Sequence, residues 1–116
     1  MNNLREKLND LNALIVAFKF HEALNKFYDE EVLVYENEQL SNRGLKAYHD
    51  GATEYLKNIS NASATLISTM VSDGITVTEW RYMFEHNQWG KWDKVQVSIQ
   101  RWKNGKIVLE RHHYSE

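Results

Sequence analysis

The sequence predicts an α+β domain in which three helices come first and pack on one face of a curved, mostly antiparallel sheet. Three observations predict this class. Up to Ile59, apolar residues recur every three or four positions, which is typical of amphipathic helices. From Thr65 onward the pattern has period two and is rich in Thr, Val, Ile, Trp and Tyr. Two dipeptides, Asp73-Gly74 and Asn104-Gly105, suit the two-residue loops of β-hairpins.

Each helix is predicted from its apolar stripe. The first is expected over residues 4–18, with Asn3 as its N-cap, because its apolar side chains lie four and three positions apart. A second, short amphipathic helix is expected in HEALNKFYDEE, residues 21–31, before a short strand at residues 32–34. The third helix is expected over residues 45–59, where the polar stretch SNAS ends it.

Four further strands are expected as a meander, at about 64–72, 75–86, 93–103 and 106–114. If both hairpin loops have two residues, residues at equal distances from a loop are paired, and the faces of the sheet follow. One face then mixes aliphatic with polar side chains, namely Glu79, Arg81, Val95, Val97, Ile99, Arg101, Glu110, His112 and Tyr114. The other face carries Trp80, Tyr82 and Trp102, which form too large an apolar surface to stay in water. We therefore expect a homodimer in which a second copy covers this outer face.

Composition and charge exclude several classes of function. The chain has 116 residues, the size of one domain, and we assign residues 1–116 to a single domain. Acidic and basic residues are mixed, with a net charge of -2, so neither nucleic acid nor an anionic membrane is an expected partner. The lack of cysteine and of any targeting or membrane-spanning segment predicts a cytoplasmic protein. Three histidines, His21, His49 and His86, are too dispersed for zinc, and the successive His112 and His113 point to opposite faces of a strand, so we expect no metal and no cofactor.

Four segments resemble the nuclear transport factor 2-like superfamily, also called cystatin-like α+β, and within it the SnoaL-like and ketosteroid-isomerase-like branch. They are EALNKFYDEEVLVYENE, GLKAYHDGATEYLKNI, EWRYMFEHNQWG and QVSIQRWKNGKIVLERHHY, and together they cover nearly the whole chain in the order found in that superfamily. The resemblance implies a cone whose concave sheet face and helices enclose a pocket for a small-molecule ligand. It also implies dimerisation through the outer face of the sheet.

The resemblance implies a role for Glu36. In ketosteroid-isomerase-like members a carboxylate at the end of the short strand after the second helix acts as a general base, and Glu36 occupies the similar position. Two other features of those enzymes are missing, because Ile99 stands where they have the acid of the oxyanion hole, and Asn12 lies in the region of their catalytic tyrosine. The alternative for Glu36 is a strand-end carboxylate held by loop amides.

Further candidates lie on the predicted inner face. His112 is the second candidate catalytic residue, because an imidazole titrates near neutral pH, although a hydrogen-bonded core histidine is the alternative. The candidates for ligand binding are Glu38, Tyr48, Tyr55, Glu79, Arg81, Arg101, Glu110 and Tyr114. Of these, Arg101 and Tyr114 are the candidates to stabilise charge in a reaction. The alternatives are structural: the four charges Glu79, Arg81, Arg101 and Glu110 neutralise one another, both helical tyrosines pack in the core, and Glu38 is solvated.

Two functions fit these residues. The first is a small-molecule-binding protein that acts as a cofactor-free acid–base enzyme, such as an isomerase, cyclase, dehydratase or hydrolase, on a small apolar substrate. The second is a non-catalytic ligand-binding or dimerisation module with a structural charge network. An open pocket in which Glu36 or His112 lacks a partner favours the enzyme, whereas a sealed pocket with every charge paired favours the module.

Overall fold

The computed structural model describes residues 3–115 and contains three helices and one six-stranded sheet. The helices are α1 (Leu4–Val16), α2 (Phe20–Phe27) and α3 (Leu45–Asn58). The strands are β1 (Tyr28–Glu36), β2 (Gln39–Arg43), β3 (Ile59–Val71), β4 (Ile75–His86), β5 (Gly90–Lys103) and β6 (Lys106–Tyr114). Their order is β2-β1-β6-β5-β4-β3, and only β1 and β6 run parallel. The predicted α+β class is confirmed.

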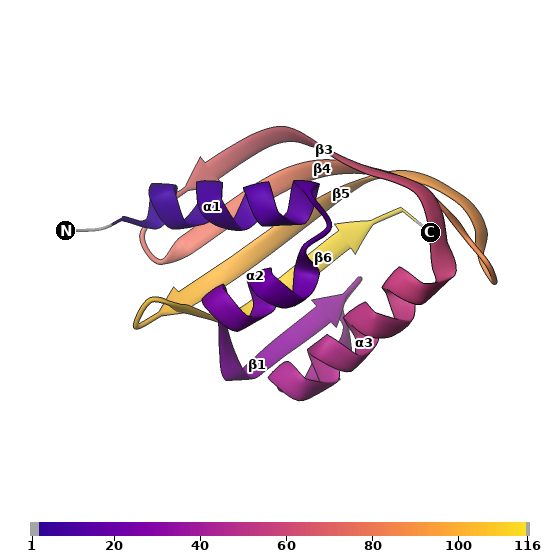
Figure 1. Cartoon of the computed structure of the whole chain (residues 1–116). Helices are drawn as coiled ribbons and strands as arrows, with labels where there is room; N and C mark the ends of the chain where they lie inside the picture. The colour runs from indigo at the N-terminus through magenta and orange to yellow at the C-terminus, as the bar shows by residue number, and fades with distance from the viewer. Residues whose placement is uncertain (1–2, 116) are drawn as a thin grey trace.

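All three helices lie on the same side of the sheet, as Figure 1 shows. The main core forms where α1 and α2 meet β1 and β6, and its fully buried members include Leu8, Leu11, Val32, Val34 and Ile107. The apolar stripe predicted for the first helix therefore does face the sheet. The predicted N-cap, Asn3, precedes α1 but makes no capping hydrogen bond with its side chain. Within residues 3–115 no helix is long and apolar enough to span a membrane.

The segment after the first strand forms a hairpin that was not predicted. The first strand extends from Tyr28 to Glu36, well beyond the predicted residues 32–34, and β2 pairs with its end. Between them Asn37 and Glu38 both have positive φ, 47° and 74°, and make a two-residue loop. Asn-Glu is a weaker hairpin signal than Asn-Gly, so this turn could not be predicted from its residues. Glu36 is thus the last residue of a strand, directly before a tight turn.

The two predicted hairpins exist, but each changes register along its length. The predicted pairing around Gly74 holds as far as the pair Ser68 and Glu79, after which a bulge in β3 shifts it. The loop Asn104-Gly105 has positive φ at both residues, as predicted, whereas at the other loop only Gly74 does. In the last hairpin the pairing shifts just past Trp102, because β6 accommodates one extra residue there.

Two parts of the predicted faces are wrong: the neighbours of Glu110 and His112, which the shift in β6 changes, and the side of the sheet on which the helices pack. A shift of one residue moves every later side chain to the other face, so Glu110 and His112 share a face with Gln100 and Ser98 and not with Arg101. That face is the one the helices cover. Trp80 and Tyr82, predicted on the outer face, point toward the helices; Trp80 is 2% exposed. Trp102 packs edge-on against Phe27, with ring centroids 6.1 Å apart. None of these three aromatic residues is available as a dimer surface.

The convex face of the sheet, which the helices leave uncovered, carries both aliphatic and charged side chains. Its aliphatic part includes Val97 and Ile99, which alternate with the inward-facing residues of β5, and Val95, which is 48% exposed. Arg81 and Asp93 form an ion pair on the same face. The predicted homodimer stays a prediction, and this face is the surface that fits it.

We expect Ile99→Lys to give a monomer where the wild type is a dimer, measured by light scattering. At a two-fold interface each substitution places two like charges together, which costs several kcal/mol. The matched control is Glu54→Lys on the exposed surface of α3, which should leave the mass unchanged. If Ile99→Lys remains a dimer, the convex face is not the dimer interface.

Candidate functional site

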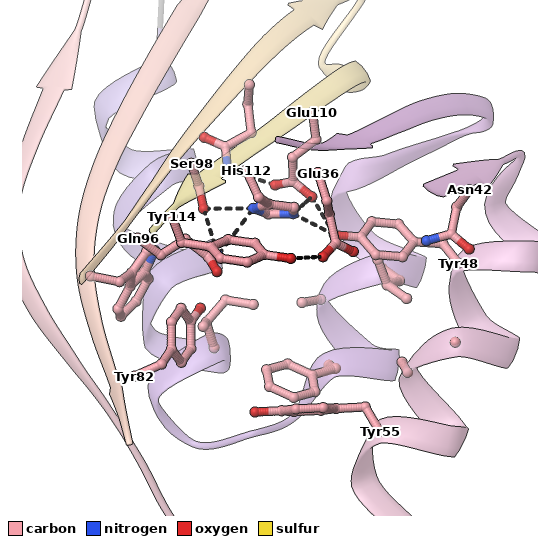
Figure 2. Close-up of a pocket in the computed structure, with 18 of the residues that line it drawn as sticks. Glu36, Asn42, Tyr48, Tyr55, Tyr82, Gln96, Ser98, Glu110, His112 and Tyr114 are labelled. Atoms are coloured by element: carbon pink, nitrogen blue, oxygen red, sulfur yellow. Dashed lines mark hydrogen bonds and ion pairs between the residues drawn. The ribbon is translucent and has the colours of Figure 1, made fainter. Parts of the chain in front are cut away.

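A cavity of about 710 Å³ lies between the concave face of the sheet and the helices. All three helices contribute to its wall, together with strands β1, β2, β4, β5 and β6. Its apolar part is largely aromatic and includes Phe20, Tyr55, Trp80, Phe84, Trp89 and Trp92. Its polar part gathers at one end, where β1, β5 and β6 bring together side chains that are labelled in Figure 2: Glu36, Gln96, Ser98, Glu110, His112 and Tyr114. A volume of this size is typical of small-molecule sites.

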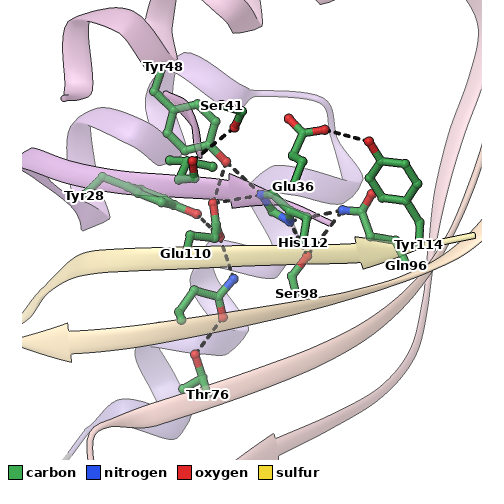
Figure 3. A network of polar contacts seen from close by, with 12 residues as sticks. Tyr28, Glu36, Ser41, Tyr48, Thr76, Gln96, Ser98, Glu110, His112 and Tyr114 are labelled. Atoms are coloured by element: carbon green, nitrogen blue, oxygen red, sulfur yellow. Dashed lines mark hydrogen bonds and ion pairs between the residues drawn. The ribbon is translucent and has the colours of Figure 1, made fainter. Parts of the chain in front are cut away.

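Glu110 is the buried centre of the polar end. Its side chain is 3% exposed and accepts hydrogen bonds from Tyr28 at 2.5 Å and from the amide of Gln100 at 2.7 Å, both on Oε2. Tyr48 donates to Oε1, and Nε2 of His112 lies 3.2 Å from the same oxygen. Figure 3 shows the resulting network across β1, β5, β6 and α3. A buried carboxylate is tolerated because each of its oxygens has partners.

The pKa values of this pair shift in the directions expected for an ion pair. Burial raises the pKa of Glu110, but the His112 imidazole and the hydrogen bonds from Gln100 and Tyr28 outweigh burial and lower it to about 2. Burial lowers the pKa of His112, but Glu110 and then Glu36 raise it above 6.5 overall. Both effects favour a carboxylate next to an imidazolium.

Both ring nitrogens of His112 are engaged by the protein. Nε2 lies 3.1 Å from the hydroxyl of Tyr48 as well as near Glu110. Nδ1 lies 2.8 Å from the hydroxyl of Ser98 and 3.2 Å from the amide nitrogen of Gln96. The Nε2–H of His112 donates to Glu110, and Nδ1 lies between the Ser98 hydroxyl and the Gln96 amide. Both nitrogens are therefore occupied, and neither is turned toward a ligand.

Glu36 is the carboxylate that remains open to the cavity. It lies beside His112 in the parallel pair of β1 and β6, and its Oε1 accepts a hydrogen bond of 2.9 Å from the hydroxyl of Tyr114. Among residues 3–115 no side chain or backbone group bonds to its Oε2. The hairpin loop fixes this arrangement, because Asn37 accepts from the backbone N–H of Tyr114 at 2.9 Å and donates to the carbonyl of His112 at 2.9 Å.

A chain of hydrogen bonds from residues of β4 and β5 holds Glu110 in place. Trp102 donates from Nε1 to Thr76 at 2.9 Å, Thr76 donates to Gln100 at 2.7 Å, and Gln100 in turn donates to Glu110. Within the described part of the chain no buried side-chain nitrogen or oxygen lacks a partner. Fully paired networks of this kind hold their members in one geometry.

Two tyrosines face the cavity across from this network. Figure 2 shows the side chains of Tyr55 and Tyr82 pointing into the space below Glu36. Neither hydroxyl bonds to another of the described residues. Burial raises the pKa of both, and Glu110 and Tyr55 raise that of Tyr82 further, so both keep their protons at neutral pH. They are hydrogen-bond donors available to a ligand.

The structure brings six of the ten predicted site residues to the cavity wall: Glu36, Tyr48, Tyr55, Glu110, His112 and Tyr114. The other four lie elsewhere. Glu79 accepts a hydrogen bond from Ser68 on the convex face, and Arg81 forms a two-pronged ion pair with Asp93 there. Arg101 is exposed on the same face, and Glu38 is exposed in the hairpin loop. The predicted charge network of Glu79, Arg81, Arg101 and Glu110 is therefore wrong, because the bulge in β6 separates Glu110 from the others.

Several residues of the site were missed. Gln96, Ser98 and Gln100 alternate along β5, a polar stripe visible in the sequence that was assigned to the outer face. Tyr28, next to an apolar run, carried no signal of its role, since its partner Glu110 is 82 positions away. Asn12 is buried and donates to Thr78 at 3.0 Å. The described residues contain no group of three potential metal ligands.

A separate pair of histidines joins α2 to α3. The Nδ1 atoms of His21 and His49 lie 2.7 Å apart, and the rings are stacked. Asn25 and Thr53 bond to the other ring nitrogens. Since a hydrogen bond between two nitrogens needs one acceptor, the two rings cannot both be protonated in this geometry. Burial and then His21 lower the pKa of His49 below 6.5.

We expect the wild type to lose more stability than His49→Gln when the pH falls from 7.5 to 5.5. The folded pKa of His49 lies below that of the unfolded chain, so the unfolded state binds protons more readily and the contribution declines as the pH falls through 6.5. Urea titrations of both proteins at the two pH values measure the difference, and other titrating groups cancel in it. Equal losses would mean that the two rings are not coupled.

Solved structures resemble this chain in fold. No protein-family model matches the sequence, and no protein of curated function is similar to it in sequence. A protein from Mesorhizobium loti described as a SnoaL-like polyketide cyclase is 19% identical, with a TM-score of 0.82 over 97% of this chain and 100% of its own. A nuclear transport factor 2-like protein of unknown function from Burkholderia xenovorans is 22% identical, with a TM-score of 0.74 over 97% and 82%. IdmH from Streptomyces antibioticus, described as a polyketide cyclase, is 9% identical, with a TM-score of 0.77 over 98% and 93%.

The predicted resemblance is therefore confirmed at the level of the fold: the chain has the nuclear transport factor 2-like, or SnoaL-like, fold.

Proposed function

We propose that the chain binds a small, largely apolar organic molecule in its cavity and that Glu36 removes a proton from it without a cofactor. The observation that carries this proposal is that Glu36, within the described part of the chain, is hydrogen-bonded on one oxygen only and lines the cavity. Every buried polar atom around it has a partner, whereas its own Oε2 has none among residues 3–115 and Glu36 lines the cavity. A carboxylate that is fixed on one oxygen and open on the other is suited to act as a general base.

The surroundings hold the Glu36 carboxylate still. Tyr114 fixes Oε1, and the loop residue Asn37 fixes Tyr114 through its backbone. When His112 is protonated, which its raised pKa favours, its positive charge lies next to this carboxylate. In this proposal His112 acts through its charge, and Glu36 alone contacts the reacting proton.

The cavity also offers groups for the negative charge that such a step creates. When a carbon or oxygen of the ligand loses its proton, charge develops on a nearby oxygen, as in an enolate. The hydroxyls of Tyr55 and Tyr82 face the cavity without a partner among the described residues and stay protonated. In this proposal these two hydroxyls stabilise the developing negative charge in place of Arg101 and Tyr114, which were predicted from the sequence. Arg101 does not line the cavity, and Tyr114 already donates to Glu36. Isomerisation, cyclisation and dehydration of a ketone all begin with such a step.

A non-catalytic binding module is the second candidate, and the closed network around Glu110 favours it. Tyr28, Tyr48, Gln100 and His112 saturate that carboxylate, as in a purely structural ion pair. In such a module Glu36 would only orient a bound molecule. The two candidates share the cavity and differ in whether the ligand is changed.

A thermal-shift screen tests the binding that both candidates require. The library consists of aromatic and polycyclic ketones, run against the wild type, Glu36→Gln and the exposed neighbour Glu38→Gln as matched control. A ligand at 100 times its Kd adds about 2.7 kcal/mol to the folded state. We expect hits that stabilise the wild type and Glu38→Gln, with a slightly smaller effect in Glu36→Gln, because the aromatic wall supplies most of the binding. A library without a single hit on the wild type would contradict the proposal.

A further inference from the structure

Lys94 is the one lysine or arginine among the described residues that line the cavity. It belongs to β5 and is half-buried. Its Nζ lies 4.2 Å from the centre of the Trp92 ring and 5.6 Å from that of Tyr114, and it donates a hydrogen bond of 2.6 Å to the carbonyl of Ser115. Two aromatic faces and a carbonyl thus hold the ammonium at the wall of the cavity.

Within residues 3–115 this ammonium has no counter-ion. An ammonium has three N–H donors, and one is used by Ser115. Among residues 3–115 no carboxylate pairs with Lys94, although Lys46, Lys57 and Arg81 each have such a partner. The cation at the cavity wall therefore differs from these three in lacking a carboxylate partner among the described residues, and two of its donors are left for another molecule.

The position of Lys94 orients a ligand. Trp92, on which Lys94 lies, contacts Trp89, and Trp89 is 59% exposed, so this end of the cavity opens to solvent. Glu36 lies at the other end of the Tyr114 side chain, bonded to its hydroxyl, while Lys94 lies against the ring. An anionic group placed beside Glu36 would be repelled, and one placed beside Lys94 is attracted.

We infer that the ligand is an organic anion with an apolar body, and that Lys94 selects it by pairing with its carboxylate, sulfonate or similar group at the open end of the cavity. This inference rests on the proposed function, because it concerns the same cavity. It adds the chemical class of the ligand: an aromatic body between Tyr55, Phe84 and Trp92, a reactive proton toward Glu36, and a negative charge toward Lys94. Lys94 is a specificity residue and takes no part in proton transfer.

Two fluorescent probes that differ only in charge test the inference. 8-Anilinonaphthalene-1-sulfonate is N-phenyl-1-naphthylamine with one added sulfonate, and both brighten when they leave water for an apolar site. We expect the wild type to bind the sulfonate on the order of tenfold more tightly than the neutral amine, the effect of one charge-assisted hydrogen bond. Lys94→Met should abolish this preference and leave the Kd of the neutral amine within about twofold.

Two variants serve as controls. Lys94→Arg keeps the positive charge and should keep the preference. Lys91→Met, exposed on the same strand and directed to the convex face, should also keep it. If both probes bind and the preference is absent, or survives in Lys94→Met, the inference is wrong while the proposed cavity function stands. If the wild type binds neither probe, the proposed binding function fails, and the inference fails with it.

Discussion

Glu110→Gln is expected to lower the free energy of unfolding by about 3 to 5 kcal/mol, the cost of removing one partner of a buried ion pair. The substitution keeps the size of the side chain and removes the negative charge that Tyr28, Tyr48 and His112 contact. The new amide also turns an acceptor into a donor in a site where all neighbours already donate. Urea titrations at pH 6 measure the loss.

The same carboxylate predicts how the stability depends on pH. Its folded pKa of about 2 lies below the ordinary value of 4.5, so its contribution is complete above pH 4.5 and is lost as the pH falls toward 2. The difference corresponds to about 3 kcal/mol, which the wild type should lose in that range and Glu110→Gln should not. His112 works in the opposite sense, because its raised pKa makes its contribution complete below 6.5 and lost as the pH rises. The ion pair of Glu110 and His112 therefore contributes most to stability between pH 4.5 and pH 6.5.

The control for this prediction is Glu79→Gln, which changes the same group on the convex face. Glu79 is only partly buried and accepts one hydrogen bond, from Ser68. Glu79→Gln should therefore change the free energy of unfolding by at most about 0.5 kcal/mol. A loss of less than about 1 kcal/mol in Glu110→Gln would show that the network does not depend on the buried charge.

Glu36→Gln is expected to lower kcat by about 10²- to 10⁴-fold on any ligand that the protein converts, the usual contribution of a placed general base. The amide keeps the hydrogen bond from Tyr114 through its oxygen and has no basic site for a proton. Binding depends mainly on the aromatic wall, so KM should change much less than kcat. Initial rates over a range of ligand concentrations separate the two constants.

Glu38→Gln is the matched control, since it removes the next carboxylate in the same loop, and that carboxylate is exposed. It should keep wild-type rates. If Glu36→Gln raised KM and left kcat unchanged, Glu36 would be a binding residue, and its proposed role as the general base would be wrong.

The sequence contains the local signals that define the class of fold. The helical spacing in the first half and the Asn104-Gly105 turn are read from neighbouring residues, and both are found in the structure. The bulge in β6 has no such signal, because an extra residue in a strand depends on how the sheet bends around its core. That one residue decides which face Glu110 shares with β5, so turn arithmetic alone assigned wrong neighbours.

The same distinction between local signals and long-range contacts applies to the residues of the site. Glu36 was found because it ends an apolar run, and His112 because of its residue type, and both line the cavity. The partners of Glu110 could not be found from the sequence, because Tyr48 lies 62 positions away on a helix. Such contacts form only when α3 packs against the concave face. Strand β2 was missed for a related reason: QLSNR is polar and mostly exposed, and its pairing with β1 depends on the Asn37-Glu38 turn.

The central claim is that a molecule bound in the cavity gives up a proton to Glu36. Its most direct test is NMR of a ketone that stabilises the wild type, incubated with the protein in D₂O. The account predicts that deuterium enters the carbon next to the carbonyl faster with wild-type protein than in buffer or with Glu36→Gln. A ketone that demonstrably binds, and whose protons exchange no faster with the wild type than in buffer, would contradict it.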